Sequence, residues 1–371
     1  SIGMAGFGLD DDFLAMDDET ASPPLKQTRS LGRKQCAAHW LPELVEEQGV
    51  LAAGSWDDAE NVVALWSVRL AQEANEGGED EAMLDASADE PLCTVPHEGC
   101  VLDLATGCAP GLPPLLFTGS GAGGVACYAV RDGRSLTPHW REGAAAHRHT
   151  AVHAVGYDAD TRMVAAACED GTLALLDAAR EGQRTAELAT REAALLALCW
   201  HAPRTVVAAG SRLQSWDLRS GAPGVRFEAG VGVAVHCAPQ LHCVAAHPQR
   251  SHLLAAGASD GSIYLWDARR AGGGPVNHLA QAHAQFKRAP GARRVGADVL
   301  GLQFGQTAYG ELMSCGSDGS VQAWTGIESE AAAPRVLVQL HMPVNDIDLS
   351  EQGTLAAASD AEQLTFIDLR R

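Results

Sequence analysis

Short apolar runs separated by tight polar turns recur along most of the chain, and several of the second runs contain a tryptophan. The clearest copies are LLAAGASDGSIYLWDAR at 253–269 and ELMSCGSDGSVQAW at 311–324. Short runs rich in Val, Ile, Leu, Tyr and Trp that are bounded by Gly, Asp or Ser are typical of β-strands joined by hairpin turns. The pattern therefore predicts a single β-hairpin unit that is repeated along the chain.

Three of the turns contain an Asp-Gly pair between two apolar runs. These pairs are Asp170-Gly171, Asp260-Gly261 and Asp318-Gly319. A two-residue hairpin turn needs positive φ angles, which Gly adopts without steric cost and Asp tolerates. The pairs therefore predict two-residue hairpin turns.

Seven copies of the hairpin can be aligned on the position that holds tryptophan in the clearest ones. The aligned residues are Trp66, Tyr128, Leu176, Trp216, Trp266, Trp324 and Ile367. Successive copies lie 40 to 62 residues apart, compared with about 40–45 residues for a four-stranded propeller blade. No single hairpin can bury both of its faces, so we expect seven blades stacked around a channel.

The segment SDGSIYLWDAR at 259–269 resembles the WD-repeat signature, and the resemblance covers roughly residues 31–371. It implies an all-β fold, a seven-bladed WD40-type β-propeller. The chain departs from the family's fullest form, because no Gly-His dipeptide opens a blade and only Trp216-Asp217 and Trp266-Asp267 keep the literal Trp-Asp pair. We therefore expect the Asp-His-Ser/Thr-Trp hydrogen-bond network to be mostly missing and apolar packing to hold the blades.

The seventh hairpin ends at Arg371, just after its third predicted strand. A blade without its outer strand would leave an open edge that invites aggregation. The unassigned β-like segment is LGRKQCAAHW at 31–40. We expect this N-terminal segment to supply the missing strand of the last blade and so to close the ring; the alternative is that it is an irregular linker.

The net charge of −20 is concentrated in two segments without basic residues. Residues 1–24 contain six acidic side chains, and residues 70–90 contain eight. Acidic segments rich in Gly, Ala or Ser cannot bury a core and are typical of disorder. The predicted organisation is a disordered acidic tail at 1–30 and a propeller at 31–371, with a disordered insert at about 70–90. A docking motif at Phe13-Leu14 is the alternative for the tail.

The acidic insert falls between the third and fourth strands of blade one if 91–96 is that fourth strand. A basic loop falls between the last strand of blade five and the first strand of blade six, and it contains Lys287, Arg288, Arg293 and Arg294. In a propeller these two types of connection emerge on opposite faces. The basic loop is either a soluble hairpin tip or a contact for an acidic partner.

Two motif matches and one histidine cluster do not have the context that their chemistry requires. The run at 257–261 matches a GxSxG nucleophile pattern, but a strand follows Ser259 where a helix is needed. The run at 119–124 matches GxGxxG, and again no helix follows to face a pyrophosphate. His147, His149 and His153 have no carboxylate or Cys at ligand spacing. We therefore expect no catalytic, cofactor-binding or metal-binding site, and no small-molecule substrate.

The remaining composition indicates a protein of a reducing compartment. The ten cysteines form no CxxC pair, so disulfides are not expected. No apolar run approaches the roughly 18 residues of a membrane span, and no signal peptide is visible. The acidic balance opposes non-specific nucleic-acid binding, which needs Lys and Arg at the phosphates.

Three distinctive stretches narrow the resemblance within the WD-repeat proteins. They are GSWDDAENVVALWSV (54–68), LHCVAAHPQRSHLLAAGASDGSIYLWDARR (241–270) and VNDIDLSEQGTLAAASDAEQL (344–364). Together they resemble the family of forty-three-kilodalton WD-repeat nucleoporins, from Trp40 to the C-terminus. The chain departs from it between blades six and seven, where it is shorter and Ala-rich.

The resemblance implies a non-enzymatic scaffold in the nucleus, at the nuclear pore. Such a protein is a peripheral subunit of the Y-shaped outer-ring complex, docks on a helical-solenoid nucleoporin and supports nucleocytoplasmic transport. The alternative is a WD-repeat adaptor for a ubiquitin ligase or a chromatin complex. The candidate partner-binding residues are the four basic residues at 287–294 and two aromatic residues in apparent loops, Trp140 and Tyr309; for both aromatic residues, a core position at a blade edge is the alternative.

Overall fold

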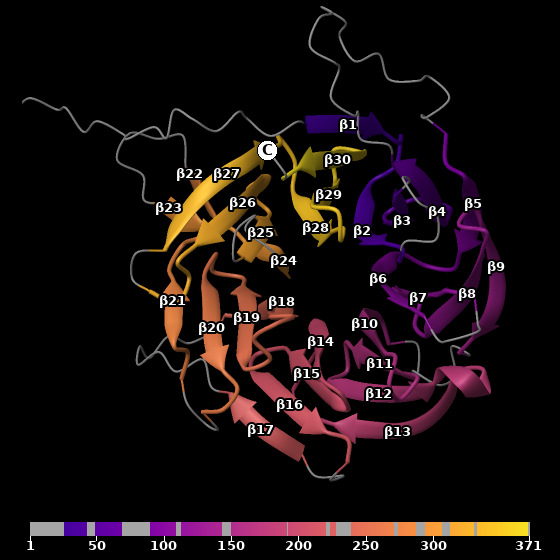
Figure 1. Ribbon diagram of the computed structural model, residues 1–371, viewed down its shortest axis with the longest axis horizontal. Helices are drawn as coiled ribbons and strands as arrows, with labels where there is room; N and C mark the ends of the chain where they lie inside the picture. The colour runs from indigo at the N-terminus through magenta and orange to yellow at the C-terminus, as the bar shows by residue number, and fades with distance from the viewer. Residues whose placement is uncertain are drawn as a thin grey trace, which may run out of the picture.

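The chain folds into a ring of seven four-stranded antiparallel sheets, which are the predicted blades (Figure 1). The computed structural model describes residues 26–42, 49–68, 90–108, 113–142, 150–190, 192–219, 223–227, 239–270, 274–286, 294–305, 312–329 and 332–369. The predicted fold class, a seven-bladed WD40-type β-propeller, is confirmed. No helix in these ranges has the length and apolar character that crossing a membrane requires.

The first four blades follow one another along the chain, each from an inner strand at the axis to an outer strand at the rim. Blade one is β2 (Gln35–Trp40), β3 (Gly49–Ser55), β4 (Asn61–Val68) and β5 (Cys93–His97). Blade two is β6 (Val101–Gly107), β7 (Leu115–Ser120), β8 (Val125–Arg131) and β9 (Ser135–Arg141). Blade three is β10 (Val152–Asp158), β11 (Met163–Cys168), β12 (Thr172–Asp177) and β13 (Gln183–Ala189). Blade four is β14 (Ala197–Ala202), β15 (Thr205–Ala209), β16 (Leu213–Asp217) and β17 (Pro223–Phe227).

The last three blades contain one inserted hairpin and the closure of the ring. Blade five is β18 (Leu241–Ala246), β19 (Leu253–Ala258), β20 (Ile263–Asp267) and β21 (Asn277–Leu279). The hairpin of β22 (Ala284–Phe286) and β23 (Arg294–Gly296) follows. Blade six is β24 (Val299–Phe304), β25 (Leu312–Gly316), β26 (Ser320–Thr325) and β27 (Ala333–Gln339). Blade seven is β28 (Val344–Leu349), β29 (Thr354–Ser359), β30 (Gln363–Asp368) and β1 (Lys26–Ser30).

An N-terminal strand closes the ring as expected, but the segment proposed for it is wrong. Strand β1 pairs with β30 from Lys26↔Ile367 to Ser30↔Gln363, whereas most of segment 31–40 forms β2, the inner strand of blade one. The polar sequence of β1 has little apolar signal because it lies at the rim, where one edge and much of its surface face solvent. The propeller therefore includes Lys26–Ser30, and deleting residues 1–30 would remove the closing strand.

Each pair of adjacent blades, including blades seven and one, shares one cluster of buried apolar side chains. The second strand of every blade contributes small residues, as in the Ala-rich runs of β3, β11, β15, β19 and β29. Some approaches leave no room for a side chain: a Cβ on Gly54 of β3 would lie 2.3 Å from the Val101 side chain of blade two. The blades are therefore held together mainly by apolar contact between neighbours.

Proline residues lie in the outer strands of four blades. They are Pro96, Pro138, Pro223 and Pro334, in β5, β9, β17 and β27. Proline has no N–H to offer to a further strand, so it is tolerated at a sheet edge and discourages pairing with another chain. The rim of these blades is thus protected against edge-to-edge aggregation.

The Asp-Gly turns differ from the two-residue turns that the sequence predicts. Gly171, Gly261 and Gly319 have φ of +78°, +83° and +78°, whereas the preceding aspartates do not have positive φ. Each glycine N–H bonds to the carbonyl three residues earlier, which is a β-turn followed by a left-handed glycine. Each aspartate keeps a negative φ, and its carboxylate accepts a hydrogen bond from the N–H two residues later, at 2.9–3.0 Å.

Candidate interaction surfaces

The aligned tryptophans are buried third-strand residues that face a neighbouring blade. Trp66, Trp216, Trp266 and Trp324 are at most 6% exposed, and they pair across the sheet with Leu51, Val206, Leu254 and Leu312. The aspartates that follow two of them have a separate role at the surface. Asp217 accepts hydrogen bonds from Arg219, and Asp267 accepts them from Arg269. In each pair the donors are two guanidinium nitrogens and the backbone N–H of the arginine. These bonds hold the pKa of Asp217 down to about 2 and that of Asp267 well below its usual range.

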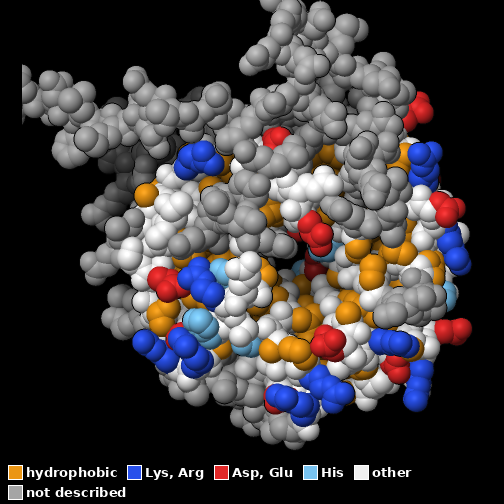
Figure 2. Space-filling model, viewed as in Figure 1, with side chains coloured by type: hydrophobic (Ala, Val, Ile, Leu, Met, Phe, Trp, Pro, Cys, Tyr) orange, Lys and Arg blue, Asp and Glu red, His pale blue; other side chains and the backbone are white. Residues whose placement is uncertain are grey.

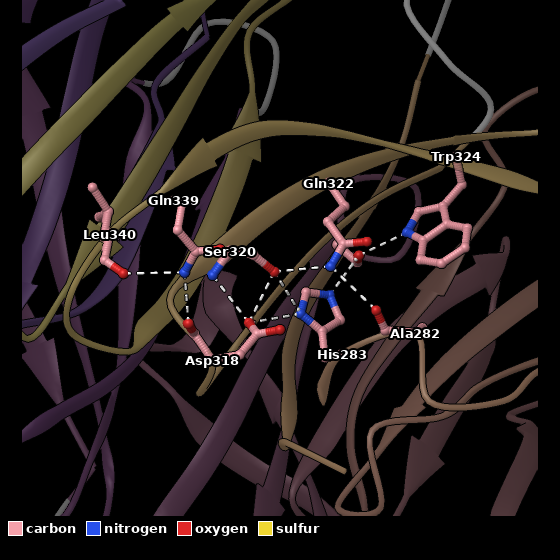
Figure 3. Close-up of polar contacts among 9 residues, drawn as sticks. Ala282, His283, Asp318, Ser320, Gln322, Trp324, Gln339 and Leu340 are labelled. Carbon is pink, nitrogen blue, oxygen red and sulfur yellow. Dashed lines mark hydrogen bonds and ion pairs between the residues drawn. The ribbon is translucent and has the colours of Figure 1, made fainter. Parts of the chain in front are cut away.

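Blade six contains a complete polar network around a buried histidine (Figure 3). The His283 Nδ1 atom lies 2.9 Å from Asp318 Oδ1, and its Nε2 atom lies 2.8 Å from Ser314 Oγ. Trp324 Nε1 donates to the same Ser314 oxygen at 2.9 Å. Ser320 Oγ donates to Asp318 at 2.9 Å and lies 3.1 Å from His283 Nδ1. The network ties the loop after blade five to the turn and the strands of blade six.

Asp318, His283 and Ser314 are hydrogen-bonded in the same succession as the Asp, His and Ser of a hydrolase triad, but they cannot act as one. Both His283 and Ser314 have no exposed surface, and the Ser314 oxygen accepts the indole N–H of Trp324. A nucleophile must reach its substrate and transfer its proton to the histidine. Ser259 of the GxSxG match lies in the turn between β19 and β20, as expected, and its hydroxyl accepts from Gln240 N–H at 3.0 Å. The GxGxxG match spans the hairpin between β7 and β8, also as expected.

The blades differ at the position equivalent to Ser314. This position lies on the second strand of each blade, two residues after the residue that pairs with the aligned third-strand residue, as Leu312 pairs with Trp324. Blade two has Thr118 there, which lies 2.9 Å from His97 Nε2. The other five blades have alanine, namely Ala53, Ala166, Ala208, Ala256 and Ala357. Trp66 and Trp266 accordingly have buried Nε1 atoms without a hydrogen-bond partner. Among the described residues the full network is thus confined to blade six, so the prediction that it is mostly missing is confirmed.

The axis of the ring is hollow and lined by the inner strands (Figure 2). Two cavities of about 350 and 420 Å³ lie along it, and both are lined by Asp103 and Asp346. The larger of the two is also lined by Asp348, Tyr157 and Trp200. The carboxylates bridge neighbouring blades: Asp103 accepts Val155 N–H at 2.7 Å, Asp346 accepts Ala38 N–H at 3.0 Å, and Asp348 accepts Trp40 N–H at 2.8 Å. They satisfy backbone groups where no sheet continues from blade to blade.

Burial dominates the electrostatics of these channel carboxylates. Desolvation raises the pKa of Asp103 to about 6, although backbone N–H groups of Val155 and Leu104 favour its charged form. Desolvation also raises the pKa of Asp346 and Asp348, and for Asp346 the neighbouring charge of Asp103 adds to the effect. The carboxylates serve mainly as acceptors for the backbone, so the channel is a structural feature of the ring.

A larger hollow of about 670 Å³ opens between the outer strands of blades five and six. Strand β21 has only three residues whereas β27 has seven, so the two rims do not match in length. Val336 of β27 lines the hollow and is 58% exposed. Its other walls mix small, polar and aromatic side chains, and they include Asp318, Ser320 and Trp324 of the blade-six network.

The junction between blades seven and one carries a half-buried tryptophan in a turn. Trp56 Nε1 donates to Asp360 Oδ1 at 3.0 Å, and Lys34 Nζ lies 5.5 Å from the centroid of the Trp56 ring. The N–H of Asp360 donates to the carbonyl of Pro343 at 3.1 Å. Met342, the residue before Pro343, is 37% exposed. The Trp-Asp-Asp run contributed only to the resemblance. The signal for a surface role is a tryptophan in the turn between β3 and β4, where blades five and six have serine just before Asp-Gly.

The residues expected to bind a partner have mixed outcomes. Trp140 is not in a loop: it lies in β9, is 9% exposed and packs on Phe117 with ring centroids 5.9 Å apart, because the outer strand of blade two turns this side chain toward blade three. Lys287, Arg288, Arg293 and Tyr309 lie outside the described residues, as does the acidic insert from 70 to 89. Arg294 belongs to β23, whose backbone alone is described. Residues 1–25 of the acidic tail also lie outside the described residues, and so do His147 and His149. His153 lines the smaller of the two channel cavities.

The comparisons with known proteins agree on a propeller and on one group of relatives. Residues 233–267 match the family described as WD domain, G-beta repeat. Nucleoporin Nup43 of Mus musculus is 27% identical over 284 residues, which is 74% of this chain and 68% of that protein. Nucleoporin Nup43 of Homo sapiens is 25% identical over 295 residues, covering 76% and 70%.

Solved structures show the same fold at lower identity. The structure titled "Structure of U3-55K" has a TM-score of 0.67 at 16% identity, covering 92% of this chain and 98% of that one. A chain of the "Crystal Structure of Mitotic Checkpoint Complex" also has a TM-score of 0.67, at 18% identity, covering 99% and 100%. With the seven blades, these findings show a WD40-type β-propeller with a WD repeat at 233–267 and similarity to the Nup43 nucleoporins.

Proposed function

We propose that this protein is a non-enzymatic scaffold nucleoporin, a peripheral subunit of the outer-ring Y-complex of the nuclear pore. The observation that supports it most is the likeness to two Nup43 proteins over about three quarters of the chain. Structures at 16–18% identity share only the propeller, so the additional identity to Nup43 goes beyond what the fold itself requires. The sequence relationship is what supports this function, because a propeller alone serves many roles.

The architecture fits a part that supports other proteins. Each blade is locked to both neighbours by a shared apolar cluster, and the N-terminal strand β1 ties the ring to β30 near the C-terminus. The Asp-His-Ser arrangement of blade six is buried, and its hydrogen bonds connect the segments of that blade. Such a disk offers a preorganised surface, which lowers the entropy cost of association. The proposed partner is a helical-solenoid nucleoporin, and the proposed role is support of the pore and of nucleocytoplasmic transport.

The experiment is affinity capture of the tagged full chain from its own cells, with quantification of the stoichiometric partners and imaging of the tagged protein. We expect helical-solenoid nucleoporins in near-equal amount and fluorescence at the nuclear rim. Recovery of ubiquitin-ligase or chromatin subunits, with a diffuse or chromosomal signal, would replace the scaffold proposal with the adaptor alternative. An unrelated propeller expressed with the same tag is the control for non-specific capture.

A further inference from the structure

The face that carries the second-to-third strand turns has two apolar side chains, Trp56 and Met342, at the junction of blades seven and one. Trp56 and Met342 come from different blades and are joined through Asp360, which accepts the Trp56 indole and donates its own N–H to Pro343, next to Met342. Asn345 Nδ2 also donates to Asp360, at 2.7 Å. Trp56 is therefore fixed before any partner arrives, and Met342 is one of only two exposed large hydrophobic side chains among the described residues.

Carboxylates outnumber basic groups around this pair. Lys34 forms an exposed pair with Asp57 at 2.7 Å, and Arg33 contacts Asp58 at 3.5 Å and the backbone carbonyl of Glu60. Glu362 and Asp360 lie close enough to help raise the pKa of Lys34, after the larger effect of its hydrogen bond to Asp57. The two basic side chains are thus already paired with acids of the same chain, and further acids remain to face solvent. We call Trp56, Met342, Lys34, Asp57, Glu60 and Glu362 the seam surface.

We propose that the seam surface is the docking site for a protein segment whose apolar side chains are flanked by Lys or Arg. Tryptophan is enriched among residues that dominate binding energy, and a fixed ring loses little entropy on association. An acidic rim attracts a basic segment and disfavours an acidic one. Met342 supplies a flexible apolar contact beside the rigid ring. The inference deepens the proposed function, on which it rests for taking the occupant to be a protein partner.

The two exposed hydrophobic residues make a matched pair for crosslinking in cells. The photoreactive residue p-benzoylphenylalanine replaces Met342 in one full-length protein and Val336 in another. Val336 is more exposed but lies on the outer strand of blade six. We expect a stoichiometric crosslink from position 342 to a peptide with Lys or Arg beside apolar residues, and none from position 336. No crosslink at 342, or a crosslinked peptide that is acidic, overturns the proposal.

Binding measurements with the crosslinked partner, purified as a full chain, then test the energetics. We expect Met342→Glu to weaken binding at least 10-fold, because it places a carboxylate in the apolar centre. Glu60→Lys should weaken it several-fold and reduce its salt dependence, whereas Val336→Glu should change it less than 2-fold. Equal effects of Met342→Glu and Val336→Glu would exclude the seam surface. A crosslinked partner that is not a nucleoporin would overturn the proposed function while leaving the seam surface supported.

Discussion

Blade five and blade six show that the Trp-Asp signature and the polar network it is associated with are separate features. Blade five keeps the literal Trp266-Asp267 pair, but its buried indole N–H has no partner and its aspartate binds Arg269 at the surface. Blade six has Trp324 followed by threonine, and yet it contains the full network of His283, Asp318 and Ser314.

One hydroxyl contributes to the difference. Ser314 lies between the histidine and the tryptophan of blade six, whereas blade five has Ala256 at the equivalent position. Five of the seven blades have alanine at this position, and in two of them, blades one and five, the buried indole N–H of the tryptophan has no hydrogen-bond partner. A polar network is thus dispensable in most blades, while in blade six its members depend on one another once they are buried.

The largest expected effect comes from removing the histidine of blade six. His283→Ala leaves the half-buried Asp318 and the buried Ser314 without this partner, so we expect the free energy of unfolding to fall by about 3 kcal/mol. Denaturant unfolding of the full chain measures it. His278→Ala in blade five is the matched control, because that exposed ring stacks on Tyr264 and its loss should cost under about 0.5 kcal/mol. Similar losses in both variants would mean that the network does not stabilise blade six.

Removing the bridging hydroxyl should have the next largest effect. Ser314→Ala gives blade six the residue that five other blades have, but it leaves His283 Nε2 and Trp324 Nε1 buried without their partner. We expect a loss of about 2 kcal/mol in the same unfolding measurement. An unchanged stability would show that blade six tolerates alanine as the other blades do.

The turn aspartates of the two blades should differ in how their contribution depends on pH. Asp318→Ala should cost about 1 kcal/mol more than Asp260→Ala, because both lose a turn hydrogen bond but only Asp318 contacts a histidine. Although burial alone would raise it, the bonds with His283 and Ser320 hold the pKa of Asp318 below 3.8. A carboxyl whose pKa is lower in the folded state contributes stability above the unfolded value and loses it as the pH falls.

The difference between wild type and Asp318→Ala should therefore be largest above pH 4 and shrink in more acidic solution. Unfolding curves at several pH values measure it for both aspartate variants. A difference that grows as the pH falls would contradict the role given to the charged form of Asp318.

The smallest expected effect comes from adding the hydroxyl to blade five. Ala256→Ser would place an oxygen where Trp266 Nε1 now has no partner, and we expect a change of less than about 1 kcal/mol in either direction. The gain of one bond is offset by the cost of burying a new hydroxyl. A stabilisation of several kcal/mol would show that the indole N–H alone limits blade five. Ala255→Ser, one residue earlier on β19, is the control for burial without that indole.

Much of the fold could be predicted from local pattern, and the errors have physical causes. The seven hairpins and their buried tryptophans follow from alternating apolar runs and turn residues. The pattern does not indicate the closing strand β1, because an outer strand needs few apolar residues, and it favours the more apolar segment that follows. It places Trp140 in a loop because the strand of Trp140 is also polar and contains a proline. It does not indicate the blade-six network, because the histidine follows alanine, not glycine, and lies 35 residues before Asp318.

By itself, the sequence determined that the chain is a seven-bladed propeller and which residues form the turns and the buried third strands. Each of these features depends on neighbours within one hairpin, so a local pattern is enough to specify it. Only the tertiary structure decided which strand closes the ring, which indole N–H groups have partners, and that Trp56 and Met342 share one surface. These depend on contacts between segments as far apart as the two ends of the propeller, and the packing of the blades around the axis is what brings them together.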